Sequence, residues 1–234
     1  MNALAVLALG FFLGMRHATD ADHVVAVSAI VSRERSPRAA LWIGALWGLG
    51  HSATILLVGG AIVLFGLVIP PRLGLSLEMS VAVMLVVLGA LNLSGGLRGV
   101  QAAAGGDHST HSAGGHAHLP LAAGSWRLRP LCVGLVHGLA GSAAVALLVL
   151  ATLSDARWAL AYLAIFGFGT VLGMMLLTSA LSVPLAAAAR RFASFDRSIA
   201  RATGFLSVAF GLFLAYRIGI HDGLFTGSAN FTPR

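Results

Sequence analysis

The feature that most constrains this chain is a polar run inside an apolar segment. The heptapeptide His17–His23 reads His-Ala-Thr-Asp-Ala-Asp-His and follows Arg16 directly, within a stretch from about Asn2 to Val31 that is otherwise almost wholly apolar. An ionised side chain that faces lipid costs several kcal/mol. Two histidines, two aspartates and an arginine in such a segment therefore predict an internal, hydrated polar site in a membrane-spanning chain.

The composition is typical of a polytopic membrane protein. Hydrophobic residues make up 58% of the 234 positions and charged residues only 10%, a balance that leaves no soluble domain of useful size. The chain has no lysine, and Cys132 is its one cysteine, which excludes a lysine Schiff base and a multi-cysteine metal cage. The formal charge of +7 comes from arginines spread among short loops, so we expect no nucleic-acid partner.

Hydropathy predicts an all-α fold with six transmembrane helices. The apolar segments lie near residues 2–31, 40–69, 79–98, 130–153, 158–185 and 199–220. The first two are longer than the roughly 20 residues that a bilayer requires, which predicts a tilt, a break or an interfacial extension. Close helix packing in the second segment is predicted from Gly44, Gly48, Gly50, Gly59 and Gly60. The Pro70-Pro71 pair predicts the end of that segment, because proline cannot donate the helical hydrogen bond.

The arginines predict the orientation of the chain in the membrane. One side of the predicted spans carries Arg33, Arg35, Arg38, Arg98, Arg127, Arg129, Arg190, Arg191, Arg197 and Arg201, and the other carries Arg72, Arg157, Arg217 and Arg234. Over short loops this asymmetry places both termini outside the cytoplasm of a bacterial-type inner (plasma) membrane. No basic region precedes the first span, so we interpret it as retained rather than as a cleaved signal peptide.

Residues 101–129 are predicted to form a histidine-rich cytoplasmic loop. Its imidazoles are His108, His111, His116 and His118. Such a loop could bind a borderline divalent metal ion, and the alternative is a low-complexity linker with incidental affinity. We assign it at most an accessory, buffering role.

The two halves on either side of this loop resemble each other. Gly14-Met-Arg-His-Ala matches Gly134-Leu-Val-His-Gly at an offset of 120 residues, Gly48-Leu-Gly matches Gly167-Phe-Gly at 119, and Gly89 matches Gly211 at 122. The near-equal offsets predict a 3+3 duplication, with residues 1–100 as the first three-helix repeat and residues 130–234 as the second repeat and a short tail. An odd number of spans per half inverts one half relative to the other, an architecture typical of transporters with a site near the midplane. His17 and His137 are therefore expected to approach each other.

The heptapeptide cannot aim all its polar groups at one ion from a straight helix. At roughly 100° per residue, His17, Asp20 and His23 follow one slowly rotating stripe and Asp22 points away. Either the helix is distorted, or Asp22 acts from another face and Asp20 pairs with Arg16. Histidine nitrogen with carboxylate oxygen suits nickel, cobalt or zinc. The alternative is a buried ion-pair cluster that holds helices together.

These residues carry a resemblance to a known family. Arg16-His-Ala-Thr-Asp-Ala-Asp-His23 resembles the histidine, four residues, aspartate-histidine signature of the nickel/cobalt transporter family, and Gly50-His-Ser-Ala-Thr54 is similar to that family's glycine-histidine-serine motif. The resemblance implies transport of Ni2+ or Co2+. The metal-pathway residues that it implies are His17, Asp22, His23 and His51, to which we add Asp20 and His137 from their positions in the spans.

The later half departs from the larger members of that family. They have eight helices and further acidic signatures, whereas this chain has six predicted spans and no acidic ligand within a later one. The stretch His137-Gly-Leu-Ala-Gly-Ser-Ala-Ala resembles instead the shorter, urease-accessory-type nickel permeases. That branch also fits an exterior amino terminus.

Together these observations predict a secondary permease for divalent transition-metal ions, Ni2+ first and Co2+ next, with import favoured. No P-loop is present, and we expect neither an enzyme nor a prosthetic group. The alternatives are an efflux protein of the same family, a nontransporting accessory subunit and a membrane metalloenzyme. The expected partners are the cargo ion, the lipid bilayer, and either a second copy of the chain or an accessory metalloenzyme-maturation protein.

Overall fold

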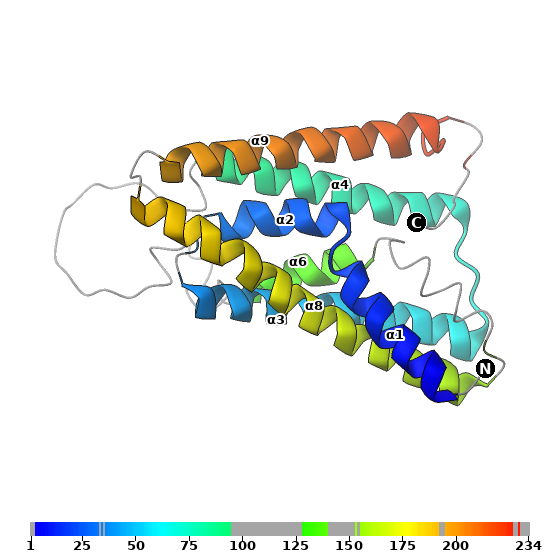
Figure 1. The fold of residues 1–234 in the computed structure, drawn as a ribbon. Coiled ribbons are helices and arrows are strands. Elements are labelled where there is room, and N and C mark those ends of the chain that lie inside the picture. The colour runs from blue at the N-terminus through cyan, green and yellow to red at the C-terminus, as the bar shows by residue number, and fades with distance from the viewer. Residues whose placement is uncertain are drawn as a thin grey trace.

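The computed structural model describes eight helical elements. The described residues are 3–32, 34, 36–94, 128–139, 153, 155–191, 195–226 and 229. The elements are α1 (Ala3–His17), α2 (Ala21–Val31), α3 (Pro37–Phe65), α4 (Pro71–Leu93), α6 (Arg129–Gly138), α8 (Ala156–Arg191), α9 (Phe195–Tyr216) and the π-helical turn η3 (Arg217–His221) (Figure 1). All regular structure in these residues is helical, as the sequence predicted.

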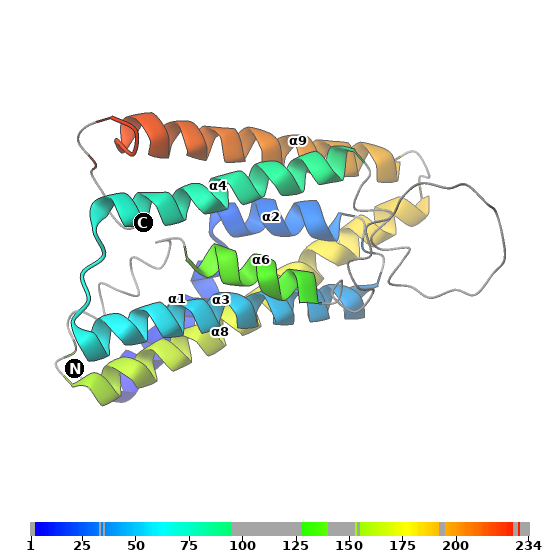
Figure 2. The same cartoon turned by 180° about the vertical axis from the view of Figure 1, so that it is seen from behind.

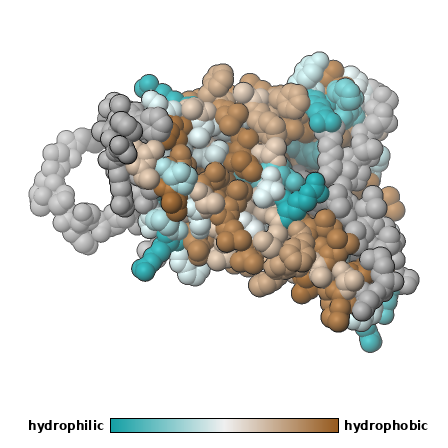
Figure 3. Space-filling model, viewed as in Figure 1, coloured by the Kyte–Doolittle hydropathy of each residue, from teal (hydrophilic) through white to brown (hydrophobic). Residues whose placement is uncertain are grey.

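Several of these helices are suited to a bilayer. In the described part of the chain, four are long and apolar enough to cross it: Pro37–Phe65, Pro71–Leu93, Ala156–Leu185 and Ser198–His221. Two shorter apolar helices, Leu4–His17 and Ala21–Val31, accompany them. Large apolar side chains cover much of the outer face (Figure 3), which in water would be an aggregation surface. The chain is therefore a polytopic, all-helical membrane protein.

The first apolar segment is broken into two helices. α1 ends at His17 and α2 begins at Ala21. In the turn between them the N–H of Thr19 donates to the carbonyl of Arg16 at 2.8 Å, and the N–H of Asp20 donates to the carbonyl of His17 at 3.0 Å. The break thus satisfies its own backbone groups, as an interruption within a membrane must. A break was one of the outcomes that the length of this segment predicted.

The predicted limits of the second span are wrong at both ends. α3 begins at Pro37, after Ser36, whose hydroxyl accepts a hydrogen bond from the N–H of Ala39. It ends at Phe65, where Gly66 adopts a left-handed φ of 63°. Hydropathy ignores such caps, and apolar residues after Gly66 extended the predicted helix.

The Pro70-Pro71 pair begins a helix instead of ending one. Pro71 is the first residue of α4, a position where a fixed φ and a missing N–H are no disadvantage. The third span therefore starts well before the predicted residue 79, because polar residues such as Arg72 and Glu78 lower the hydropathy of the first turns.

The later spans agree in part with the prediction. α6 covers the beginning of the fourth predicted span, and residues 140–152 of that span lie outside the described residues. α8 extends beyond the predicted 158–185 at both ends and contains Pro184. α9 with η3 covers the sixth predicted span. The histidine-rich loop also lies outside the described residues.

The helices form two packed groups (Figures 1 and 2). α3 packs along α8, with α1 lying on α8 and α6 lying on α3. α4 packs along α9, and α2 contacts α4, α8 and α9 between the two groups. α1, α4 and α8 begin at one end of the bundle, whereas α3, α6 and α9 begin at the other (Figures 1 and 2).

Glycines let these helices approach backbone to backbone. A Cβ on Gly14 would collide with the carbonyl oxygen of Phe166, and one on Gly134 with the carbonyl oxygen of Trp47. Helix α3 behaves as predicted at Gly44, Gly48 and Gly50, where a Cβ would collide with a facing backbone, and at Gly59, where it would lie 3.0 Å from a leucine side chain. At Gly60 the nearest atom would be 3.6 Å away, so that position is not tight.

We expect Gly89→Ala to destabilise the fold. Its Cβ would lie 2.6 Å from the carbonyl oxygen of Gly204 across the α4–α9 contact. Overpacking of this kind lowers the free energy of unfolding by about 1–3 kcal/mol, which thermal denaturation in detergent, followed by circular dichroism, would detect. Gly60→Ala is the matched control and should leave the melting temperature unchanged or slightly higher. Equal melting temperatures for the two variants would contradict the packing described.

Candidate metal centre

The break between α1 and α2 places opposite charges at suitable helix ends. Arg16 and His17 occupy the last turn of α1, and Asp22 lies in the first turn of α2. The carboxyl end of a helix carries partial negative charge and the amino end partial positive charge. The basic residues at the end of α1 and the acidic residue at the start of α2 are therefore each stabilised by the helix end on which they lie. Because the helix restarts at Ala21, Asp22 and His23 point in other directions than they would on a continuous helix.

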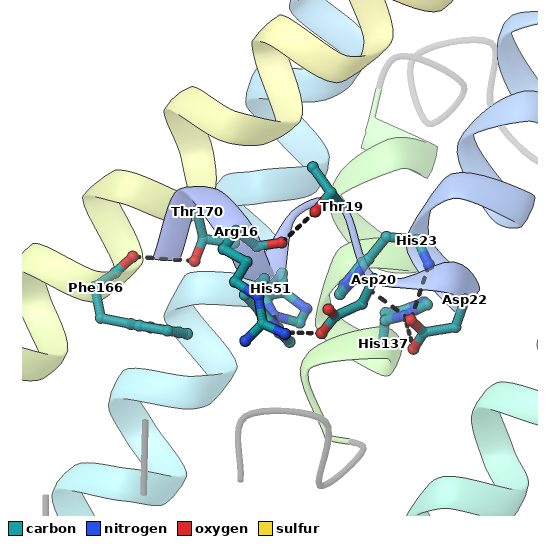
Figure 4. A network of polar contacts seen from close by, with 10 residues as sticks. Arg16, Thr19, Asp20, Asp22, His23, His51, His137, Phe166 and Thr170 are labelled. Carbon is teal, nitrogen blue, oxygen red and sulfur yellow. Dashed lines mark hydrogen bonds and ion pairs between the residues drawn. The ribbon is translucent and has the colours of Figure 1, made fainter. Parts of the chain in front are cut away.

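Four histidines from four helices gather at this break. His17, His23, His51 and His137 come from α1, α2, α3 and α6, and their exposed fractions are 6%, 0%, 0% and 0%. His23 lies centrally, with its ring centroid 4.8 Å from that of His17, 5.0 Å from His51 and 4.3 Å from His137. The close-up view shows His23, His51 and His137 converging with both aspartates (Figure 4).

Each aspartate of the motif is paired with a histidine. Asp20 accepts a hydrogen bond from Nδ1 of His17 at 2.8 Å, and Asp22 accepts one from Nε2 of His137 at 2.9 Å. The second oxygen of Asp22 accepts from the backbone N–H of His23 at 3.0 Å. The Asp20 side chain is 40% exposed and that of Asp22 is 16% exposed. Carboxylates in this role fix the tautomer and orientation of histidines that bind metals.

Several ring nitrogens of the cluster are buried without a partner. Within the described part of the chain, both ring nitrogens of His23 and Nδ1 of His51 and of His137 make no hydrogen bond. A buried donor or acceptor without a partner costs about 1–3 kcal/mol. The cluster therefore has ring nitrogens that are available to a bound cation, which makes the arrangement suitable for a metal ion.

Two groups of side chains have the spacing of a metal site. One is His17, His23 and His51, and the other is Asp22, His23 and His137. In each group the ligand atoms lie within 4.8 Å of one another. Imidazole nitrogen with one carboxylate oxygen and no thiolate suits nickel, cobalt and zinc better than copper(I) or magnesium.

Aromatic side chains enclose the cluster. The ring of Trp47 lies 5.7 Å from that of His137 and is fully buried, and the ring of Phe166 lies 5.5 Å from that of His17. An apolar wall of this kind limits the access of water to a metal site. Neither residue was predicted from the sequence. Trp47 lies one helical turn before His51. Phe166 follows Trp47 by 119 residues, the same offset that separates Gly48 from Gly167.

The structure brings six of the ten predicted ligand residues together. They are His17, Asp20, Asp22, His23, His51 and His137. His137, which the sequence analysis added from its position alone, is as deeply buried in the cluster as the motif histidines. The four remaining residues, His108, His111, His116 and His118, lie outside the described residues.

Comparison with known proteins decides the family. The urease accessory protein UreH of Bacillus sp. (strain TB-90) is 36% identical to this chain over 227 residues, which cover 96% of each protein. The chain belongs to the UreH family of urease accessory proteins. This confirms the resemblance to the urease-accessory branch. No protein-family model and no solved structure matches this UreH-family chain.

We expect Ni2+, Co2+ or Zn2+ to stabilise this UreH-family protein through His23. A free ion concentration 100-fold above the dissociation constant adds about 2.7 kcal/mol to the free energy of unfolding, which a thermal shift in detergent would report. His23→Ala should abolish the shift. His221→Ala is the matched control, because the His221 side chain is 77% exposed and is paired with Asp222. An equal shift with Mg2+, or one retained in His23→Ala, would contradict this assignment.

Proposed function

We propose that this protein is a secondary permease for divalent transition-metal ions, with Ni2+ as the preferred cargo and Co2+ next. The observation that carries the proposal is His23, a fully buried imidazole whose two ring nitrogens make no hydrogen bond within the described residues. It lies among three other histidines and beside Asp22 in a membrane protein. A cluster built only for stability would pair these nitrogens.

The choice of nickel rests on the ligands and on the family. Imidazole and carboxylate ligands suit late first-row divalent ions. The relative's name associates it with urease, and the motif from His17 to His23 resembles that of nickel/cobalt transporters. We propose that the protein imports the ion and supplies it to the maturation of a metalloenzyme, and that it is not itself an enzyme.

The two halves are proposed to be inverted repeats of one three-helix unit, residues 1–100 and 130–234. Reciprocal contacts support this. Gly14 contacts the carbonyl of Phe166, and Gly134 contacts the carbonyl of Trp47. Gly134 follows Gly14 by 120 residues, and Trp47 precedes Phe166 by 119. Equivalent helices also run in opposite directions, as the pairs α3 and α8 and α4 and α9 do (Figure 1).

A second set of contacts supports the same symmetry at a distance from the metal centre. A Cβ on Gly89 would lie 2.6 Å from the carbonyl oxygen of Gly204, and one on Gly211 would lie 2.8 Å from that of Ala82. Gly211 follows Gly89 by 122 residues, and Ala82 precedes Gly204 by the same number. The two contacts are therefore equivalent under the proposed duplication. Inverted repeats place a substrate site at the interface of the two halves, where the histidine cluster lies.

The proposed orientation has both termini outside the cytoplasm. α3 and α6 begin near Arg38 and Arg129, at the end of the bundle opposite to the beginnings of α4 and α8, which carry Arg72 and Arg157 (Figure 1). The arginine-rich end is proposed to face the cytoplasm. The loop of residues 101–129 would then be cytoplasmic and available to buffer the ion.

The test is uptake of radiolabelled Ni2+ into proteoliposomes. We expect flux in the parent protein, inhibition by excess Co2+, and loss of more than about 10-fold in His17→Ala and His23→Ala, since loss of a ligand or its orienting partner lowers affinity about 10–100-fold. His221→Ala at matched incorporation should transport normally. Flux that persists in His23→Ala would contradict the proposed site.

The same assay separates the remaining interpretations. Absence of flux in the parent, with Ni2+ binding intact, would favour an accessory subunit. Transport that runs only from the cytoplasmic face, in vesicles of known orientation, would favour efflux. Neither outcome is expected for a permease that imports its cargo.

A further inference from the structure

We propose that the cluster contains two alternative sites for one cargo ion, and that His23 is a ligand in both. This inference rests on the proposed function and describes a step within it. The first site is His17, His23 and His51, and the second is Asp22, His23 and His137. The ion is handed from one site to the other while it remains bound to a single shared imidazole.

The two sites exclude each other because of the chemistry of His23. A neutral imidazole has a proton on one ring nitrogen and one free lone pair on the other. His23 is fully buried, and neither nitrogen is committed to a hydrogen bond within the described part of the chain. The ring can therefore serve either site, but it can hold only one ion at a time.

Asp20 orients one ligand of the first site. Asp20 accepts the Nδ1 proton of His17 at 2.8 Å, which leaves the lone pair of His17 on Nε2. That nitrogen accepts a hydrogen bond from Nε2 of His51 at 3.0 Å, and an ion that binds at this site replaces this bond. The Asp20 side chain is 40% exposed. It therefore lies between the buried His17 and the protein surface.

The second site, like the first, contains a hydrogen bond between two of its own ligands. Asp22 and His137 are hydrogen-bonded to each other at 2.9 Å, and an ion that binds there replaces this bond. The carboxylate offsets part of the ion's charge, which the all-histidine first site does not do. Transfer to the second site therefore moves the ion toward the compensating charge.

The two sites also differ in the helices that they join. His17 and His51 belong to α1 and α3, in residues 1–100, whereas His137 belongs to α6, in residues 130–234. Occupation of the second site thus connects the two halves of the chain through the ion. A ligand shifts a conformational equilibrium only if it binds one conformation more tightly than the other. A contact between the two halves that forms only when the second site is occupied provides such a difference.

The experiment compares binding with transport in His51→Gln and His137→Gln. Equilibrium dialysis with Ni2+ should give one ion per chain in the parent and in both variants, with affinity reduced by about 10-fold, because each variant keeps one site. Transport into proteoliposomes should fall by more than about 10-fold and should not recover at saturating Ni2+, because a lost site blocks transfer rather than capture. His221→Gln, outside the cluster, is the control for both measurements.

X-ray absorption of the Co2+-loaded proteins gives an independent result. His137→Gln should leave nitrogen ligands from the first site, and His51→Gln should leave a mixture of nitrogen and carboxylate oxygen from the second. Gel filtration establishes that each variant is folded, and His51→Asn and His137→Asn replace any variant that is not.

Three results would overturn the inference. Two ions per parent chain would contradict the mutual exclusion, and identical ligand sets in both variants would indicate one site. Recovery of full transport at high Ni2+ would mean that the substitutions weaken capture alone. If the parent neither binds nor transports Ni2+, the proposed function fails as well, and the two failures are thereby distinguished.

Discussion

The interruption between α1 and α2 is the constraint on which the candidate metal centre depends. A continuous helix would turn Asp22 away from the stripe that holds His17 and His23. The break restarts the helix at Ala21 and gives the carboxylate a favourable helix end. The neighbouring helices then need to supply only one imidazole each, His51 from α3 and His137 from α6. The cluster is therefore a property of the local backbone as much as of the side chains.

The pairing of charges in the cluster argues for a bound cation rather than for a stabilising ion-pair network. Both carboxylates are partnered by histidines, His17 and His137, and the side chain of Arg16 is exposed. A network that served stability would satisfy its own nitrogens, and His23 has two that are unsatisfied within the described residues. Buried polar groups are costly when partly satisfied, and a metal ion would supply the missing partner.

The sequence predicted much of this site because its ligands are concentrated in motifs. Three features could be identified in the sequence: the spacing from His17 to His23, the histidine of the second span, and the offset to His137. Helix limits were predicted less well, because hydropathy does not register a cap such as Ser36 or a left-handed Gly66. Trp47 was missed because a buried aromatic residue in an apolar helix has no distinctive pattern. The choice between a distorted and a straight helix required the backbone itself.

The glycine contacts beside the cluster connect packing to chemistry. Gly14 and Gly134 each lie three residues before a histidine of the cluster, His17 and His137, and each sets how closely its helix approaches a helix of the opposite half. Gly134 faces Trp47 of α3, so it bears directly on the distance between His137 of α6 and His51 of α3. A methyl group at Gly134 would move α6 and α3 apart without altering either histidine. The spacing of these two candidate ligands is thus adjustable during evolution from a position that is not itself a candidate ligand.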